Sequence, residues 1–292
     1  MEMVCMVVVR LQGGLGNQLF QYALGRRIAL TNEMPLKLDL SKLTRNRLRT
    51  YKLSHFKIEA EIATPDDIMK AKGGAGITGY FIRRLDRFKP HYRRFWVKEN
   101  YFHFDPNILT ISGTVFLEGY WQSEPYFKSI EKKLREELAL RSKPSALSEQ
   151  IAQTMQNTTS VSLHVRRGDY AANPTTYYLC PLKYYLAAIA KIKRCVEDPH
   201  FFVFSDDPVW TRENLTIDAP ATFVTHNRAD RDYEDLWLIS QCQHHIIANS
   251  TFSWWGAWLC SRPEKKVISP KQWSWQPKYN NKERIPEGWE TL

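Results

Sequence analysis

The chain of 292 residues lacks any long hydrophobic run. No stretch reaches the ~18 consecutive apolar residues that a membrane-spanning helix needs. The N-terminus has Glu2 where a secretory signal would carry positive charge, and its apolar run stops at Arg10. We therefore expect a first β-strand at this position and a cytoplasmic protein.

Cysteine is also scarce, with five residues in the chain. The number is odd, no C-x-x-C pair occurs, and no cysteine has metal-ligand spacing to the eight histidines. This pattern excludes a disulfide scaffold and a zinc site of the usual spacing. We expect the cysteines to be small buried side chains in a reducing compartment.

Positive charge is present in excess but unevenly distributed. Residues 41–98 hold fifteen Lys and Arg against five Asp and Glu, a difference equal to the net charge of +10 for the whole chain. Within it, residues 79–89 alternate aromatic side chains with arginine. Such a segment suits peripheral contact with an anionic membrane, nucleic-acid binding or a solvated basic face. We expect membrane contact through residues 76–98 and no nucleic-acid partner.

The first half of the chain predicts an α/β domain. Residues 4–11 form an apolar β-branched run, glycines follow, and residues 18–30 have helical periodicity. Further strands are predicted at 36–40 and 114–121, with the basic segment 41–98 as an insertion between them. A charged helix is predicted over 124–140, and the domain boundary after residue 142.

The second half, residues 143–292, alternates strand-like and helix-length segments, which indicates a parallel sheet covered on both faces. The clearest helix is predicted at 181–195. Two such domains predict a GT-B-like architecture of two Rossmann-like domains with a cleft between them. Ligands in these folds bind beyond the carboxyl ends of the strands. The predicted strands are 160–165, 201–204, 221–224, 245–248 and 266–269.

A glycine-rich turn follows the first predicted strand. Gly14 and Gly16 match the start of the dinucleotide fingerprint G-x-G-x-x-G, but Leu19 occupies the third glycine position. The turn therefore predicts a close approach of the backbone to a ligand rather than an NAD site. Asn17 opens the following helix, where side chains and free N–H groups meet anions or hydroxyls.

Two adjacent arginines follow the predicted strand 160–165. In the run His164 to Tyr170, Arg166 and Arg167 precede a glycine that lets the chain turn. A guanidinium group can donate two parallel hydrogen bonds to two oxygens of a phosphate group. Two arginines at this position therefore predict a site that binds a diphosphate, here called the diphosphate clamp. One alternative is that the two arginines simply lie on the surface. Another is that Arg167-Gly168-Asp169 is an adhesion motif, although this tripeptide is easily over-interpreted.

Acidic residues follow two other segments. Asp206 is placed to accept hydrogen bonds from a nucleotide's ribose or base, although Asp before Pro is also an ordinary helix start. Asp230 and Asp232 have the D-x-D spacing of a metal site. Because they directly precede a helical run, we expect them to cap that helix, and we expect no metal.

Hydroxyl groups cluster after the predicted strand 245–248. Asn249, Ser250, Thr251 and Phe252 stand at the start of a helix, where backbone N–H groups bind anions. This site would face Arg166 from the neighbouring strand, so that one diphosphate is gripped from two sides. The tryptophans that follow are expected to be core residues.

These pieces together resemble the bacterial α-1,2-fucosyltransferases of glycosyltransferase family eleven. The matching segments are 13–18, 164–170, 204–206 and 249–255, in the family's order and spread over nearly the whole chain. The resemblance implies inverting transfer of L-fucose from GDP-fucose to the 2-hydroxyl of a galactoside, without a metal. The acceptor would be a galactose-terminated oligosaccharide or a lipid-linked glycan, in surface polysaccharide or oligosaccharide synthesis.

The resemblance also assigns roles. Arg166 would hold the β-phosphate beside His164, residues 250–252 would contact the phosphate from a second side, and Asn17 would lie near the reacting centre. Asp169 is a candidate general base, or equally a structural ion-pair partner. The full donor-binding set expected is Gly14, Gly16, His164, Arg166, Arg167, Asp206, Asn249, Ser250, Thr251 and Phe252; the catalytic set is Arg166, Asn17 and Asp169.

Three other functions fit parts of the sequence. A fucosyltransferase with another linkage, such as α-1,6, would use the same clamp. A nucleic-acid binder would use residues 41–98, but this leaves the polar residues at the strand ends unexplained. A non-catalytic carbohydrate-binding module would use the tryptophan cluster.

Overall fold

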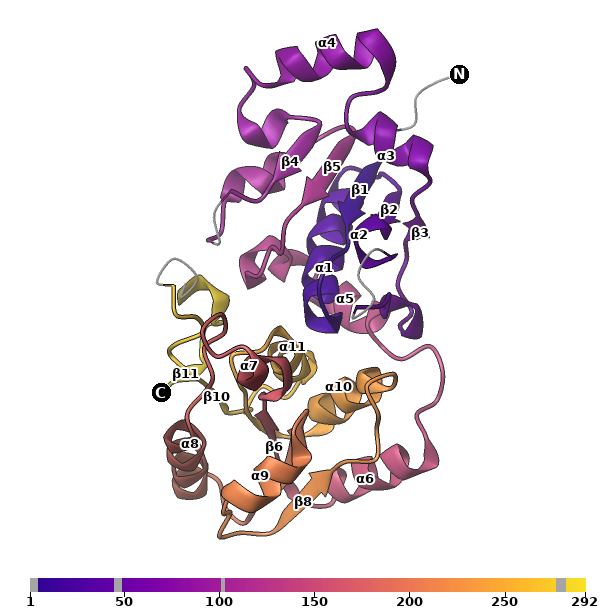
Figure 1. Cartoon of the computed structure of the whole chain (residues 1–292). Helices are drawn as coiled ribbons and strands as arrows, with labels where there is room; N and C mark the ends of the chain where they lie inside the picture. The colour runs from indigo at the N-terminus through magenta and orange to yellow at the C-terminus, as the bar shows by residue number, and fades with distance from the viewer. Residues whose placement is uncertain (1–4, 45–48, 101–102, 277–281) are drawn as a thin grey trace. The chain divides into compact units, whose positions relative to one another are not determined.

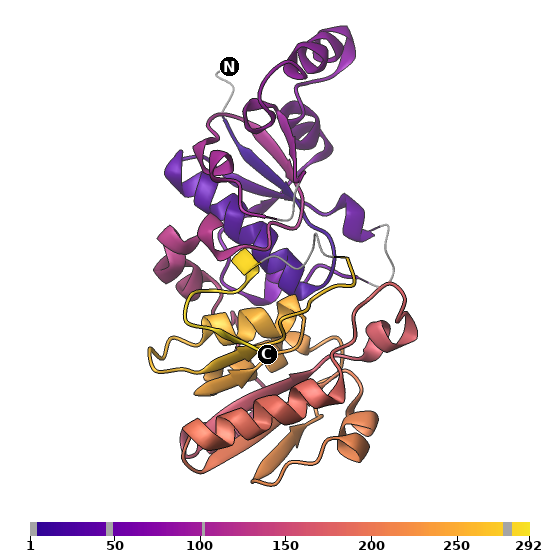
Figure 2. The same cartoon turned by 90° about the vertical axis from the view of Figure 1, so that its left-hand side faces the viewer.

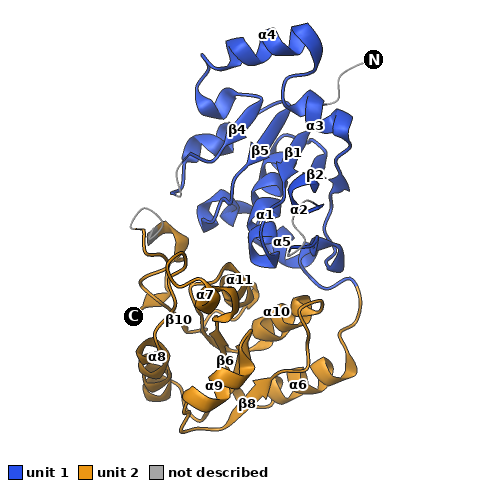
Figure 3. Cartoon of the chain, viewed as in Figure 1, with its two compact units in different colours: residues 1–141 blue, residues 142–292 orange. Residues whose placement is uncertain are grey.

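The chain forms two compact units, residues 1–141 and 142–292 (Figure 3). The computed structural model describes residues 5–44, 49–100, 103–276 and 282–292. Each unit contains one parallel β-sheet with helices packed around it (Figure 1). The expected α/β class with two Rossmann-like sheets is confirmed.

The sheet of unit 1 has the order β3-β2-β1-β5-β4, with every described pair parallel. Its central strand β1 (Val7–Arg10) pairs with β2 (Leu36–Asp39) and β5 (Val115–Glu118). Three valines of β1, Val7 to Val9, are completely buried, as expected for a strand covered on both faces. The carboxyl end of β1 therefore lies in the middle of the sheet edge.

Helix α1 (Leu15–Thr31) follows β1 after the glycine turn and packs against it. The remaining helices of unit 1 are short. They are α2 (Ser41–Thr44), η1 (Leu53–His55), α3 (Pro65–Ala71), α4 (Gly76–Asp86), η2 (His91–Arg93), η3 (Pro106–Thr110), η4 (Glu124–Tyr126), η5 (Lys128–Ile130) and α5 (Glu131–Glu137).

The basic segment 41–98 is not a simple insertion, and that expectation was wrong. It supplies both outer strands of the sheet, β3 (Glu61–Ile62) beside β2 and β4 (Trp96–Lys98) beside β5. Strands of two and three residues are too short to show a periodic hydrophobic pattern. Their pairing is fixed by the neighbouring strands rather than by local sequence.

The continuous helix expected over 124–140 is broken into η4, η5 and α5. Phe127 has φ −139° and ψ 5°, which lies outside the α-helical region. The residue is completely buried and its ring lies 5.9 Å from the ring of Phe20 on α1. Tertiary packing of this side chain therefore accompanies the interruption of the helix.

The sheet of unit 2 has the order β11-β10-β9-β6-β7-β8, again with parallel pairs. All five strands expected from the sequence are present, and a sixth, β11, was not expected. The bounds are β6 (Thr159–Val165), β7 (Pro199–Ser205), β8 (Ala221–Val224), β9 (His244–Ile246), β10 (Val267–Ser269) and β11 (Glu290–Thr291).

Helices cover both faces of this sheet. On β7, Phe201 and Val203 pack in one cluster with α8 (Leu182–Cys195), while Phe202 and Phe204 pack in another with α6 (Ala146–Gln156) and α10 (Asp232–Gln241). This alternation is the period of two expected of a strand buried on both faces. Figure 2 shows α8 lying along one face of the sheet.

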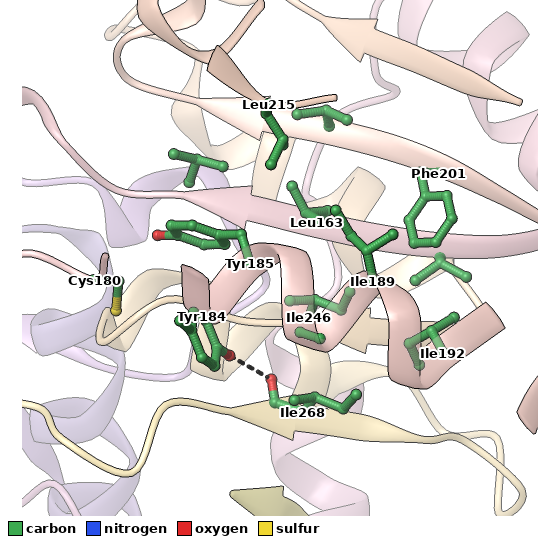
Figure 4. Close-up of a cluster of buried hydrophobic side chains, with 14 of the residues drawn as sticks. Leu163, Cys180, Tyr184, Tyr185, Ile189, Ile192, Phe201, Leu215, Ile246 and Ile268 are labelled. Atoms are coloured by element: carbon green, nitrogen blue, oxygen red, sulfur yellow. Dashed lines mark hydrogen bonds between the residues drawn. The ribbon is translucent and has the colours of Figure 1, made fainter. Parts of the chain in front are cut away.

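Tyr184 ties α8 to the sheet. Its hydroxyl donates to the carbonyl oxygens of Ile247 at 2.7 Å and Ile268 at 3.2 Å, inside an otherwise apolar cluster (Figure 4). The last helices of the unit are α7 (Gly168–Ala172), α9 (Pro208–Asn214), α11 (Thr251–Leu259) and η7 (Lys282–Arg284).

The tryptophans of α11 are core residues, as expected. Trp254 and Trp255 are completely buried and Trp258 is 2% exposed. None of them is placed on a sugar-binding surface. In the described part of the chain, every helix is too short or too polar to cross a lipid bilayer.

Candidate active site

The loop after β6 lies at a switch point of the sheet in unit 2. Strand β6 has β7 on one side and β9 on the other, so the chain leaves its carboxyl end toward one neighbour and returns later to the other. Ligands of open α/β sheets bind at this place. The run His164 to Tyr170 forms the end of β6 and the start of α7.

Arg166 is held between two carboxylates. Its Nη2 atom lies 2.6 Å from Asp169 Oδ1 and its Nη1 atom 2.9 Å from Asp206 Oδ2. The side chain is 22% exposed, and its guanidinium carbon lies 5.2 Å from the centre of the Tyr170 ring. A guanidinium has five N–H donors, so this arrangement fixes its position and leaves donors for a ligand.

Arg167 makes different contacts. Its Nε atom lies 3.2 Å from Asp207 Oδ2, and its guanidinium carbon lies 3.5 Å from the centre of the Trp210 ring on α9. The two arginines therefore contact separate partners, and their guanidinium groups do not lie side by side as a pair. The contact with Trp210 was not expected from the sequence.

Asp206 organises the loop. Its Oδ1 atom accepts the backbone N–H of Arg167 at 2.7 Å, while Oδ2 binds Arg166. A Cβ atom on Gly168 would lie 2.5 Å from Oδ2, so a side chain there would require the carboxylate to shift. These contacts of Asp206 with the loop were not expected. The helix start belongs to its neighbour Asp207, which accepts from the backbone of Trp210 at 3.3 Å.

His164 is buried at the end of β6. Burial, and secondarily the charge of Arg166, lower its pKa to about 3, so the imidazole is neutral at physiological pH. Among the described residues no group hydrogen-bonds its Nδ1 atom. Its ring lies 5.6 Å from the ring of Phe252 on α11, which brings β6 and the start of α11 together.

The start of α11 has the geometry expected of a helix N-terminus. Ser250 is the N-cap, and its Oγ atom accepts the backbone N–H of Phe252 at 3.3 Å. Thr251 and Phe252 are half-buried. The Tyr170 hydroxyl donates to the backbone oxygen of Asn249 at 3.4 Å, which connects this loop to the one that carries Arg166.

The side chain of Asn249 is engaged within unit 2, and donor binding by this residue stays a prediction. It is 3% exposed, and its Nδ2 atom donates to the backbone oxygens of Tyr178 at 2.7 Å and Trp273 at 3.1 Å. Its Oδ1 atom accepts from the Cys180 thiol at 3.2 Å. Its polar atoms therefore hold three loops together.

Asp235 was missed by the sequence analysis. It lies in the first turn of α10, and Asn227 Nδ2 donates to its Oδ1 atom at 2.7 Å. Burial, and secondarily the charges of Asp232 and Glu234, raise its pKa to about 7, although Asn227 opposes this. A perturbed carboxyl group is a common sign of a functional position.

The expectation that Asp230 and Asp232 cap the following helix was wrong. Helix α10 has Arg231 as its N-cap, without a capping hydrogen bond from a side chain, and Asp232 lies in the first turn. Within residues 5–44, 49–100, 103–276 and 282–292, no three His, Cys, Asp or Glu side chains are grouped to hold a metal ion.

The carboxyl edge of unit 1 carries a second polar cluster. Gly13 has φ +81°, a conformation that favours glycine, and the turn lets Gly14 accept the backbone N–H groups of Asn17 and Gln18 at 3.0 and 3.1 Å. Gly16 is buried in the first turn of α1. The glycines therefore shape this turn.

Asn17 is joined to the loop after β5. Its Oδ1 atom accepts from Gln122 Nε2 at 2.8 Å. The preceding Trp121 has φ +57°, unusual for a tryptophan, and Glu99 accepts its backbone N–H at 3.0 Å. The sequence analysis missed Gln122, although its place just after a predicted strand was a usable signal.

Comparison with known proteins gives the family. The model of glycosyl transferase family 11 matches residues 6–291. An α-1,2-colitosyltransferase of Escherichia coli is 32% identical over 97% of this chain and 97% of its own length. The O-antigen biosynthesis glycosyltransferase WbnK of Escherichia coli is 31% identical over 90% of this chain and 93% of its own. A mouse galactoside 2-α-L-fucosyltransferase, Sec1, is 25% identical over 56% of this chain and 45% of its own length.

Solved structures support the fold. The α-1,6-fucosyltransferase NodZ co-crystallised with GDP has a TM-score of 0.55 at 15% identity, covering 91% of this chain and 96% of that one. NodZ from Bradyrhizobium in another crystal structure gives a TM-score of 0.51 at 15% identity, covering 87% and 92%. Both are GT-B fucosyltransferases, and the expected GT-B-like class is confirmed. With a family match across nearly its whole length, the chain is a glycosyltransferase and belongs to glycosyl transferase family 11.

Proposed function

We propose that this enzyme transfers L-fucose from GDP-fucose to the 2-hydroxyl of a galactoside, with inversion at the sugar carbon. The observation that carries the proposal is the position of Arg166. It is fixed by Asp169 and Asp206 at the carboxyl end of β6 and is connected through Tyr170 to the loop before α11. The family membership and its fucosyl- and colitosyl-transferring relatives point in the same direction.

The chemistry follows from charge. As the bond between fucose and phosphate breaks, negative charge grows on the departing GDP and positive charge on the sugar ring. The Arg166 guanidinium and the N-terminus of α11 would stabilise the phosphate charge without rearranging, because both are already held in place. We propose that these groups serve in place of a metal ion.

The residues around the clamp would bind the rest of the donor. The neutral, buried His164 offers one nitrogen to a hydrogen-bonding group of the nucleotide, beside the ring of Phe252. Ser250 and Thr251 would contact phosphate at the helix start. Four other members of the expected donor-binding set would shape or support the loops: Arg167, Gly14, Gly16 and Asp206. Direct contact of these four residues with GDP stays a prediction.

The acceptor hydroxyl must lose a proton, so a general base is needed. Asp169 is the candidate, and it forms an ion pair with Arg166, the proposed phosphate ligand. Asn17, paired with Gln122 in unit 1, would hydrogen-bond the acceptor sugar. Residues 1–141 would thus bind the acceptor and residues 142–292 the donor.

A second candidate donor comes from the relative that transfers colitose. Colitose is fucose without the 3-hydroxyl, so a site for one sugar differs from a site for the other by a single polar group. A site built to hydrogen-bond that hydroxyl rejects the deoxy sugar by about 10⁴–10⁵, whereas a site without such a contact discriminates weakly. We propose fucose as the preferred sugar.

The test is product formation from GDP-fucose and lactose, with and without EDTA, in wild type and Arg166→Ala. The matched control is Arg212→Ala, whose guanidinium packs on Phe223 in the same unit. We expect fucosyl-lactose in EDTA, a loss of about 10²–10³ in rate for Arg166→Ala, and near wild-type rate for the control. Loss of activity in EDTA would contradict the metal-free proposal.

Linkage and donor are tested with the same assay. Analysis of the product should show an α-1,2 link, and an α-1,6 link would overturn the acceptor position. Faster turnover of GDP-colitose than of GDP-fucose would replace the donor. We further propose that the natural acceptor is a galactose-terminated glycan, free or linked to lipid, and that the enzyme works at the inner face of a membrane.

A further inference from the structure

A strongly basic pocket lies in unit 1, beside the outer strand β4. It is formed between α4 and β4 and has a volume of about 490 Å³, within the range of about 300–1,000 Å³ typical of small-ligand sites. Its lining includes six cationic side chains. They are Lys72, Arg83, Arg84, Arg87, Arg94 and Lys98.

The cationic side chains of this pocket outnumber the acidic ones in its lining. In the described residues, none of these six side chains forms a salt bridge with a carboxylate. The one acid in the lining, Asp86, is already engaged, because its Oδ2 atom accepts the backbone N–H of Phe95 at 2.9 Å and Lys89 lies 3.1 Å from Oδ1. Arg166 of the candidate active site differs from these six side chains, because it forms salt bridges with two carboxylates.

Two lysines of the pocket pack over aromatic rings. The Nζ atoms of Lys72 and Lys98 lie 4.5 and 4.1 Å from the centre of the Trp96 ring, and Lys72 is 4.0 Å from that of Phe116. Burial, and secondarily the charge of Arg10, lower the pKa of Lys72. An anion in the pocket would favour the charged form of this lysine.

Helix α4 presents an apolar stripe beside the pocket. Ile77, Phe81, Leu85 and Phe88 follow one another at spacings of four, four and three residues, so they share one side of the helix and its extension. Their exposed fractions are 79%, 57%, 66% and 86%. Figure 1 shows α4 lying outside the sheet of unit 1.

The stripe and the pocket adjoin each other. Arg84 lies within the same turns of α4 as Phe81 and Leu85, and it also lines the pocket. The buried face of the helix is a different one, formed by Gly79 and Asp86. One helix therefore carries an outward apolar side and a basic flank, the combination typical of helices that lie in a membrane interface.

We propose that unit 1 docks on an anionic lipid bilayer, with the apolar stripe of α4 among the acyl chains and lipid phosphate groups in the pocket between α4 and β4. The occupant is a lipid surface rather than nucleic acid, because four large exposed apolar side chains gain nothing against a phosphate backbone. If the acceptor is linked to lipid, one phosphate in the pocket would belong to that acceptor, and this part of the proposal rests on the proposed function. Docking on the bilayer does not depend on the proposed function.

The experiment is flotation of the full-length enzyme with vesicles of phosphatidylcholine alone or mixed with phosphatidylglycerol. We expect binding to the mixed vesicles only. Arg84→Ala and Arg87→Ala should each weaken it by about fivefold, and Leu85→Ser by about tenfold. The matched controls are Lys132→Ala, which lies outside the basic pocket, and Val209→Ser, an exposed apolar residue of unit 2.

Turnover of lactose should be unchanged in all five variants, which shows that each is folded. Equal flotation with neutral and mixed vesicles would overturn the role of the pocket. Failure to float, or salt-dependent RNA binding through Arg84 and Arg87 in its place, would overturn the docking. Flotation uses no GDP-fucose, so the enzyme can bind vesicles even if the proposed transfer reaction is wrong. Equally, the enzyme can transfer fucose without binding vesicles, so the two proposals can be told apart.

Discussion

Arg166 Nη1 lies 2.9 Å from Asp206 Oδ2, although forty residues separate them in the chain. The other oxygen of the same carboxylate accepts the backbone N–H of Arg167 at 2.7 Å. One acid at the end of β7 therefore fixes both the side chain of the candidate phosphate ligand and the backbone that follows it. We therefore expect Asp206 to act as a positioning residue for the proposed reaction.

Replacing Asp206 by Asn should lower turnover more than stability. The amide can still accept from the backbone of Arg167, but it no longer pairs as a charge with Arg166, so the guanidinium loses its fixed orientation. We expect kcat with GDP-fucose and lactose to fall by about tenfold, less than the ~10²–10³ for loss of a whole transition-state donor, with the urea midpoint nearly unchanged. Asp207→Asn is the matched control, and equal kcat in wild type and Asp206→Asn would contradict the positioning role.

Replacing Gly168 by Ala should act through the same carboxylate. The new Cβ atom would lie 2.5 Å from Asp206 Oδ2, so the carboxylate must move and Arg166 with it. We expect a loss of about tenfold or more in kcat/KM. In an Asp206→Ala background the same glycine substitution should cost little, because the clash is gone. Equal losses in the two backgrounds would show that the glycine matters for another reason.

Replacing Asn249 by Ala should destabilise unit 2. The change removes the donors to the backbone oxygens of Tyr178 and Trp273, and each buried polar group left without a partner costs about 1–3 kcal/mol. We expect a fall of ~2–4 kcal/mol in the free energy of unfolding by urea. Asn214→Ala, an exposed asparagine that donates to Trp210, is the control and should change stability by less than ~0.5 kcal/mol. A similar small change for Asn249 would contradict its structural role.

Asp235 should make stability fall as pH rises. Its pKa is raised from 3.8 to about 7 in the folded chain, so folding favours the protonated form. The stabilisation is complete below the unfolded pKa of 3.8 and is lost as pH rises through about 7. Asp235→Asn removes this titration, and the stability difference between wild type and variant should shift against wild type by roughly 2–4 kcal/mol between pH 4 and 8.

The measurement is urea unfolding of both proteins at a series of pH values. Comparing the two removes the opposite contribution of His164, whose lowered pKa costs stability in wild type and variant alike as pH falls below 6.5. A difference that stays constant from pH 4 to 8 would show that Asp235 titrates normally.

Sequence patterns located the central strands of unit 2 because each carries a recognisable pattern of apolar side chains. Strand β7 contains the aromatic and β-branched run 201–204, and in β6 the apolar residues Val161, Leu163 and Val165 alternate with polar ones. The outer strands β3 and β4 carry no such run, since their pairing comes from β2 and β5. Local sequence thus predicts a strand that has its own pattern of buried apolar side chains. It misses a short strand that forms only because a neighbouring strand pairs with it.

The candidate site shows the same division. The place of Arg166 at a strand end followed from the motif around it, as did the N-cap at Ser250. The pairing of Asn17 with Gln122 joins residues 105 positions apart and depends on β1 and β5 being adjacent. The structural role of Asn249 likewise depends on loops that meet only in the folded chain.

The shortness of the outer strands has a consequence for self-association. Fibrils and domain-swapped aggregates grow when the free N–H and C=O groups of one sheet edge pair with those of another molecule. Strands β3 and β11 have two residues each, and all four side chains are exposed. An incoming chain would find few backbone groups in line at β3 or at β11. These two edges therefore offer little template for pairing between molecules.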